Sequence, residues 1–96
     1  MITKEQADVL LNDMGQTAKE VADFLKSQNI KGKLSNAQSC PVANYMISQG
    51  GEPDSAIYDR YNGRYDGNAF VIMTPTPVFQ FIRDFDGGTY PELVSL

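Results

Sequence analysis

The chain has 96 residues, of which 42% are hydrophobic and 21% are charged, a composition typical of one small globular domain. It contains no histidine and one cysteine, which excludes His-based acid–base relays, His zinc sites, Cys-cluster metal sites and internal disulfides. Twelve acidic residues against eight basic ones give a net charge of −4, which repels nucleic-acid phosphate. We therefore expect no metal, no cofactor and no nucleic-acid binding, although an acidic surface can also mimic nucleic acid.

The sequence also bears on the compartment. No segment approaches the ~20 consecutive apolar residues of a membrane span, and the first residues lack the apolar core of a signal peptide. A single cysteine agrees with a reducing compartment. We expect a cytoplasmic protein that does not contact a membrane.

A long amphipathic helix is predicted over residues 3–27. Thr3 and Gln6 have the spacing of a capping box, and the apolar residues behind them recur with the period of a helix. Gly15 costs such a helix about 1 kcal/mol relative to alanine unless it admits a close neighbour. Val9 and Phe24 fall outside the apolar stripe, so they either pack at its flanks or form a second contact surface. The stripe consists of Ala7, Leu10, Leu11, Met14, Ala18, Val21, Ala22 and Leu25.

A second, shorter helix is predicted to begin at Ser39. This residue is a suitable N-cap, and Pro41 falls in the first turn, where its missing N–H costs nothing. Gly50-Gly51 is expected to end the helix, and residues 52–54 to form a loop. The inward side chains are expected to be Val42, Tyr45 and Met46.

Residues 55–74 change to the pattern of extended strands and contain two turn dipeptides, Asn62-Gly63 and Asp66-Gly67. A turn at Asp66-Gly67 is favoured because it sets Tyr61 opposite Ile72, whereas the other turn sets an apolar residue opposite a polar one. The sequence therefore predicts a hairpin. The favoured register places Ile57, Tyr61, Phe70 and Ile72 on one face, and Tyr58, Arg60, Arg64, Val71 and Met73 on the other.

The third predicted helix begins at Thr76, a capping residue, followed by Pro77 at the first helical position. Gly87-Gly88 is expected to end it, and a further turn over residues 89–94 to dock Leu93 and Val94 against the body. The predicted fold is a single α+β domain over residues 1–96, with three helices packed on a β-hairpin or a small two- or three-stranded antiparallel sheet. The inward residues of this helix are expected to be Val78, Phe81, Ile82 and Phe85.

The side chains available for catalysis are few. Cys40 lies at a helix start, where a thiolate is stabilised, but a nucleophile also needs a base and the chain has no histidine. Asp84 and Asp86 could act as a carboxylate pair, yet two positions on a helix diverge by about 200°. Asp86 is expected to bond local amides in a turn. We therefore expect no catalytic residue and a protein that is not an enzyme.

The most unusual composition lies in the hairpin, which carries five of the eight tyrosines and arginines in the chain. Tyrosine and arginine are enriched at binding hot spots, because they supply rigid area and planar hydrogen bonding at modest entropic cost. The alternative is that these rings pack on the helices of the domain. The predicted partner-contact residues are Tyr58, Arg60, Tyr61, Arg64 and Tyr65.

Two segments resemble recurring stretches of small uncharacterised proteins of actinobacteria and their phages, which share a "CP-apolar-A-x-Y" helix start and an "FD-x-G-x-YP-x-L" tail. They are residues 39–46 and 85–94, under a quarter of the chain. Members of that group carry no assigned activity, so the resemblance implies a phage or actinobacterial background and no catalytic residue. Both segments are also typical of purely structural signals, the first for the start of a helix and the second for its end.

The leading functional hypothesis is a small non-enzymatic module that binds another protein, for example a phage- or host-encoded inhibitor or regulator of a host protein. The alternative is a small-ligand or nucleotide binding module built on the Tyr/Arg hairpin. A hairpin also leaves two sheet edges open, so a homodimer can form edge to edge or through Phe24 and Phe79.

Overall fold

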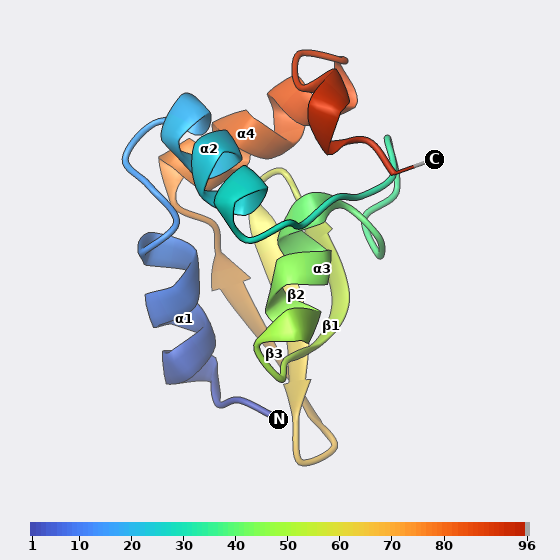
Figure 1. Cartoon of the computed structure of the whole chain (residues 1–96). Coiled ribbons are helices and arrows are strands. Elements are labelled where there is room, and N and C mark those ends of the chain that lie inside the picture. The colour runs from blue at the N-terminus through green and yellow to red at the C-terminus, as the bar shows by residue number, and fades with distance from the viewer. Residues whose placement is uncertain (96) are drawn as a thin grey trace.

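The structure, a computed structural model, describes residues 1–95 and consists of a three-stranded antiparallel sheet with four α-helices and a short 3₁₀ turn (Figure 1). The fold class is α+β, as predicted, and the sheet has three strands, within the predicted two or three. Residues 1–95 form four α-helices where three were predicted. The elements are α1 Lys4–Asn12, α2 Ala18–Ser27, α3 Pro41–Ser48, β1 Glu52–Ile57, β2 Arg60–Tyr65, β3 Asn68–Met73, α4 Thr76–Asp86 and η1 Pro91–Leu93.

The predicted single helix over residues 3–27 is wrong, because the chain breaks between α1 and α2. The capping box of Thr3 and Gln6 begins α1 as expected, but Gly15 has φ +155 and a second cap follows, in which Thr17 accepts from the backbone N–H of Glu20. A Cβ on Gly15 would lie 2.8 Å from the Cβ of Glu20. Gly15 therefore serves as the bend that folds α2 back, and not as a tolerated glycine within a helix.

The β2–β3 hairpin has the favoured register. Tyr61 pairs with Ile72 and Gly63 with Phe70, and the two turn residues Asp66 and Gly67 have φ of 52 and 80, as a type I′ turn requires. A Cβ on Gly63 would meet the Phe70 ring at 2.8 Å, so the missing side chain lets that ring lie across β2.

The predicted loop over residues 52–54 is wrong, because these residues form the first half of strand β1. Glu52 pairs with Arg64, and the register shifts by one residue between Pro53 and Ser55. This irregularity also corrects a face assignment: Ala56 pairs with Tyr61 and is buried, whereas Ile57 pairs with Arg60 on the opposite face. A bulge cannot be read from alternation alone, because it inserts one residue and reverses the face of those that follow.

The caps of α3 and α4 differ by one residue from those predicted. Cys40, and not Ser39, is the N-cap of α3, and its Sγ accepts from the backbone N–H of Ala43 at 3.5 Å. Pro41 lies in the first turn as expected. Thr76 is already helical in α4, whose N-cap is Pro75 with no side-chain hydrogen bond.

The inward faces of the helices build one core. In Figure 1, α1 and α3 lie on the same face of the sheet, while α2, α4 and η1 pack together at one end. The predicted inward residues of α4 are all buried, Leu93 docks as expected, and Gly32 forms a parallel bridge with Val94. The largest fully buried side chains are Tyr61, Phe81, Phe85, Leu11, Met14, Leu25, Met46 and Leu93.

Candidate interaction surface

The face of the sheet turned away from α1 and α3 carries no buried side chain. Alternation along the strands places the members of this outer face, and the pairing of Ser55 with Asn62 and of Asn62 with Val71 joins them into one surface. Met73 is 67% exposed and Val71 48% exposed. We define the outer face as Ile57, Arg60, Asn62, Arg64, Val71 and Met73.

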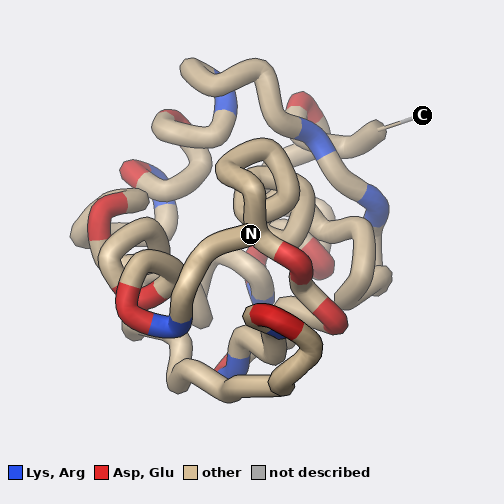
Figure 2. Tube along the Cα trace, turned by 90° about the horizontal axis from the view of Figure 1, so that it is seen from below, with Lys and Arg blue, Asp and Glu red and all other residues tan. Residues whose placement is uncertain are grey.

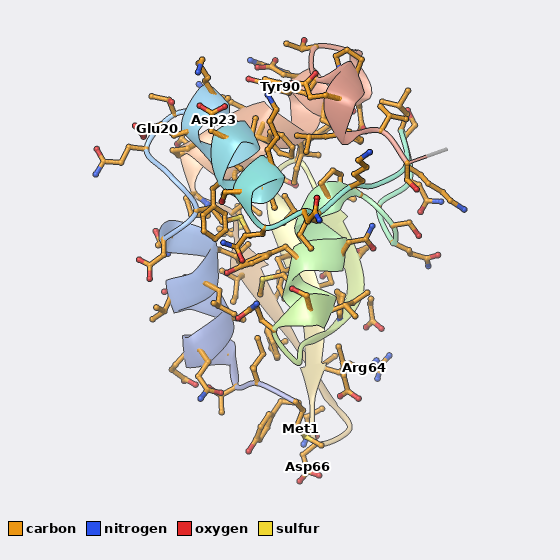
Figure 3. All side chains as sticks on the ribbon, viewed as in Figure 1. Met1, Glu20, Asp23, Arg64, Asp66 and Tyr90 are labelled. Atoms are coloured by element: carbon orange, nitrogen blue, oxygen red, sulfur yellow. The ribbon has the colours of Figure 1, made fainter. Side chains whose placement is uncertain are left out.

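The two arginines of the outer face lie four residues apart on β2, about 13 Å at the rise of a strand. Each has an aspartate neighbour: Arg60 Nε lies 3.4 Å from Asp59, and Arg64 Nε lies 3.0 Å from Asp54. Arg64 pairs with Ala69 close to the hairpin turn, where the backbone N–H of Asp66 donates to Sδ of Met1 at 3.3 Å (Figure 3). Pairing with carboxylates leaves the guanidinium planes available to polar groups of a protein while reducing their attraction for phosphate.

The three tyrosines predicted to contact a partner lie in different environments. Tyr58 lies in the β1–β2 turn, is 45% exposed and packs edge to face on Phe79, with the ring centroids 6.3 Å apart. Tyr65 is exposed at the far end of β2. Tyr61 is fully buried, so its prediction as a partner-contact residue is wrong. Odd and even positions of β2 point to opposite faces, and Tyr61 is the ring that fills the core under the helices.

Tyr61 also carries the one buried side-chain oxygen within residues 1–95 that has no hydrogen-bond partner. Burial, and secondarily the charge of Asp54, raises the pKa of Tyr61 to about 12. Since a lone buried hydroxyl costs desolvation without return, Tyr61→Phe is expected to leave the free energy of unfolding unchanged or to raise it by roughly 1 kcal/mol.

The same change is expected to alter the dependence of stability on pH. Unfolded tyrosine ionises near pH 10, whereas folded Tyr61 keeps its proton to about pH 12, so the contribution of this group is complete below pH 10 and is lost as the pH rises to 12. Urea unfolding from pH 7 to 11.5 should show a shallower loss in Tyr61→Phe than in wild type. Exposed Tyr65→Phe is the control, and a destabilised Tyr61→Phe at pH 7 would show that the hydroxyl is bonded.

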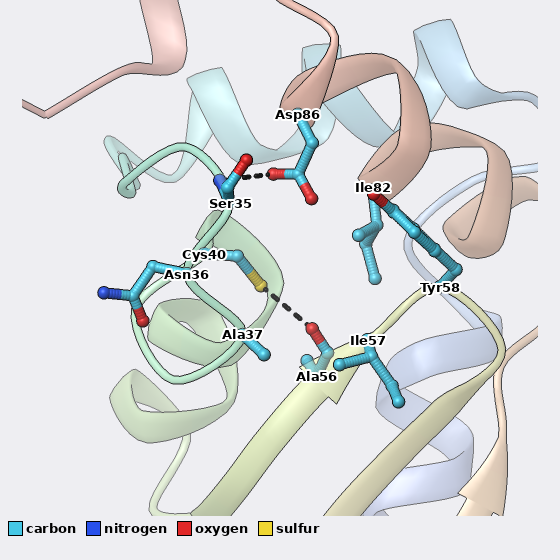
Figure 4. Close-up of a pocket in the computed structure, with 9 residues that line it drawn as sticks. All are labelled: Ser35, Asn36, Ala37, Cys40, Ala56, Ile57, Tyr58, Ile82 and Asp86. Carbon is cyan, nitrogen blue, oxygen red and sulfur yellow. Dashed lines mark hydrogen bonds between the residues drawn. The ribbon is translucent and has the colours of Figure 1, made fainter.

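Cys40 is a packed structural thiol. Its Sγ lies 3.6 Å from the carbonyl oxygen of Ala56, to which it donates, and burial raises its pKa (Figure 4). The thiol lines a pocket of about 220 Å³ between residues 35–37, the end of β1 and α4. Asp86 closes one side of this pocket, where it accepts from the backbone N–H of Ser35 at 2.9 Å, a residue far away in sequence and not a local turn amide.

The carboxylates of Asp84 and Asp86 have different partners. Asp84 lies 3.5 Å from Arg83, while Asp86 bonds Ser35. Within residues 1–95 no three Cys, Asp or Glu side chains are grouped so as to hold a metal ion. Acidic positions flank the N-terminus on both sides when the molecule is viewed from that end (Figure 2).

Comparisons with known protein families, with curated proteins and with solved structures give no match. Among residues 1–95, none of the helices has the length and apolar character needed to cross a membrane. The candidate site is accordingly defined by the position and exposure of the outer-face residues alone. Val71 and Met73 are its main apolar members, and strand alternation had already placed both on the face opposite Tyr61.

Proposed function

We propose that this protein is a non-enzymatic binding module whose outer face contacts another protein. The observation that carries the proposal is the exposure of Met73, which pairs with Arg60, and of Val71, which lies between Arg60 and Arg64, on the sheet face turned away from α1 and α3. Exposed apolar groups beside paired arginines are typical of protein interfaces, where an apolar centre is surrounded by polar groups.

The chemistry of the outer face favours a folded protein partner over a small ligand. Tyr58 lines the pocket beside Cys40, but neither Arg60 nor Arg64 does, so the Tyr/Arg hairpin does not line that cavity. Small-molecule sites enclose most of their ligand, whereas the side chains of the outer face are exposed or half-buried. A host protein is the proposed partner, in keeping with the phage or actinobacterial background that the resemblance of residues 39–46 and 85–94 implies.

The test is quantitative affinity capture from a host lysate, with a triple variant of the outer face, Arg60→Ala, Arg64→Ala and Met73→Thr. We expect partner recovery to fall at least about tenfold, since loss of roughly 1.4 kcal/mol at contact residues is a factor of ten in affinity. All three side chains point to solvent, so circular dichroism and thermal unfolding should stay close to wild type.

The matched control removes two basic residues and one exposed apolar residue elsewhere: Lys31→Ala, Lys33→Ala and Ile47→Ala. Ile47 is 52% exposed on α3, away from the outer face. Recovery of the partner should survive in this control. If the folded outer-face variant recovers the partner as well as wild type does, the outer face is not the contact surface.

A further inference from the structure

The strand β3 has a free edge. It pairs with β2 on one side only, because the sheet order is β1-β2-β3. Thr74 N–H donates to the carbonyl of Asp59 at 3.1 Å, and Tyr65 and Asn68 flank the two-residue turn, so the even-numbered residues of β3 direct their backbone groups to β2. The odd-numbered residues direct theirs outward. We define the β3 edge as the outward N–H and C=O groups of Ala69, Val71 and Met73.

The opposite edge of the sheet, formed by β1, has a hydrogen-bond partner outside the sheet. On β1, the backbone N–H of Ala56 donates to the carbonyl of Ala37 at 2.7 Å and its carbonyl accepts from Cys40 Sγ at 3.6 Å, so that edge is covered at Ala56. Within residues 1–95 the three residues of the β3 edge make no backbone hydrogen bond outside the sheet. An edge strand with unpaired donors and acceptors is a template for one more strand.

A groove of about 480 Å³ runs between the β3 edge and α1. Its sheet side is Val71, Ile72 and Met73, and its helix side is Lys4, Glu5 and Asp8. Within residues 1–95 neither Glu5 nor Asp8 forms an ion pair. The groove thus combines backbone hydrogen-bonding groups and apolar residues on one wall with two carboxylates and one ammonium on the other.

We propose that this groove binds an extended segment of another protein, in which apolar residues alternate with lysine or arginine. Added as a fourth strand, the segment directs alternate side chains to opposite faces of the sheet. One set lies beside Val71 and Met73 on the outer face, and the other faces Glu5 and Asp8. This inference rests on the proposed binding function and assigns the chemistry of the partner.

Charge argues against a second copy of this chain as the occupant. Antiparallel pairing of two β3 edges would bring two α1 helices towards each other across the seam. Each contributes two carboxylates and one ammonium to its groove wall, so like charges would face one another. A basic segment meets the opposite sign, which favours encounter and register.

The test uses two blocked seven-residue peptides, one alternating valine with lysine and one alternating valine with glutamate, titrated into the ¹⁵N-labelled full chain at low salt. We expect the lysine peptide to bind about tenfold more tightly, as two partly exposed charge pairs allow. The largest amide shifts should fall on Ala69, Val71 and Met73. A lysine peptide with N-methyl groups at alternate residues, which removes its donors on one edge, should lose binding.

Variants of α1 test the charge assignment. Glu5→Gln with Asp8→Asn should bring the two peptides to within about threefold of each other, and Glu5→Lys with Asp8→Lys should reverse the preference. The matched control, Glu52→Gln with Asp66→Asn, makes the same change in net charge away from the groove and should keep the preference of wild type. Circular dichroism establishes that each variant is folded.

The proposal is overturned if neither peptide binds, if both bind equally, or if the shifts map outside the β3 edge. It is also overturned if light scattering shows a dimer whose interface shifts map to the β3 edge, since the occupant is then a second copy. These results are separable from failure of the proposed function. Met73 belongs to both surfaces, so the two tests are separated at the other positions. Glu5→Gln with Asp8→Asn changes only α1, and Arg60→Ala with Arg64→Ala changes only the opposite face of the sheet.

Discussion

Gly32→Ala is expected to destabilise the fold by ~3 kcal/mol or more, the range of severe overpacking. A Cβ at this position would lie 2.5 Å from the carbonyl carbon of Cys40 and 2.5 Å from Cδ of Pro41, and the backbone at a helix start cannot yield as a flexible side chain can. Gly32 also donates to the carbonyl of Leu93 at 2.9 Å and accepts from the N–H of Ser95 at 2.7 Å. Moving it would break the contact between the start of α3 and the C-terminal segment.

Chemical denaturation at neutral pH measures this effect, and two other glycines supply a graded control. Gly87→Ala should be nearly neutral, because its Cβ would meet only Arg83 O and Asp84 O at 3.5 Å, an ordinary contact. Gly88→Ala has open space but φ +89, so it should cost about 1 kcal/mol for the left-handed backbone alone. A Gly32→Ala variant as stable as Gly87→Ala would contradict the packing at the start of α3.

Phe81→Ala is expected to lower the free energy of unfolding by about 3–5 kcal/mol, the usual cost of removing a buried phenylalanine. Phe81 is fully buried on α4, with its ring centroid 5.9 Å from that of Phe85 and 5.4 Å from that of Tyr90. It joins α4 to the turn that follows it. A domain of this size has a total stability of only roughly 5–14 kcal/mol, so the variant should be close to unfolding at body temperature.

Phe79→Ala is the matched control, because it makes the same substitution two residues earlier on the same helix. Phe79 is half-buried and packs on exposed Tyr58, so its removal should cost less than half as much as Phe81→Ala. Thermal unfolding of both variants measures the difference. Equal losses would mean that α4 is rotated relative to the arrangement described here.

Local patterns predicted the parts of the fold in which neighbours in sequence decide the structure. The turn at Asp66-Gly67, the Tyr61–Ile72 register, the four inward residues of α4 and the glycine ends of α3 and α4 are all present. Each depends on a backbone preference or a hydrophobic period that acts within about ten residues. The candidate outer face follows from the same register, since alternation opposes Val71 and Met73 to the buried Tyr61.

Predictions failed where distant segments decided the outcome. The helix stripe over residues 3–27 continues across Gly15, and the packing of α2 on α4 accompanies the turn there. A local signal was also present, since Thr17 and Glu20 have the spacing of a second capping box and Thr17 is the N-cap of α2. The strand character of residues 52–54 depends on pairing with β2, which no local preference of Glu52 or Pro53 indicates. The burial of Tyr61 is a similar case. The Tyr/Arg-rich composition of the hairpin led to its prediction as a partner-contact residue, but its ring is buried in the core under the helices.

The amino-acid sequence by itself determined the class of the fold, a small acidic α+β domain with a Tyr/Arg-rich hairpin, because composition, hydrophobic period and turn chemistry are local properties of the chain. Only the tertiary structure decided which hairpin residues face solvent and which edge of the sheet stays open. These depend on what α1, α3 and the loop before α3 cover: Tyr61 is enclosed, the N–H of Ala56 on the edge of β1 donates to Ala37, and β3 keeps its outward groups beside α1.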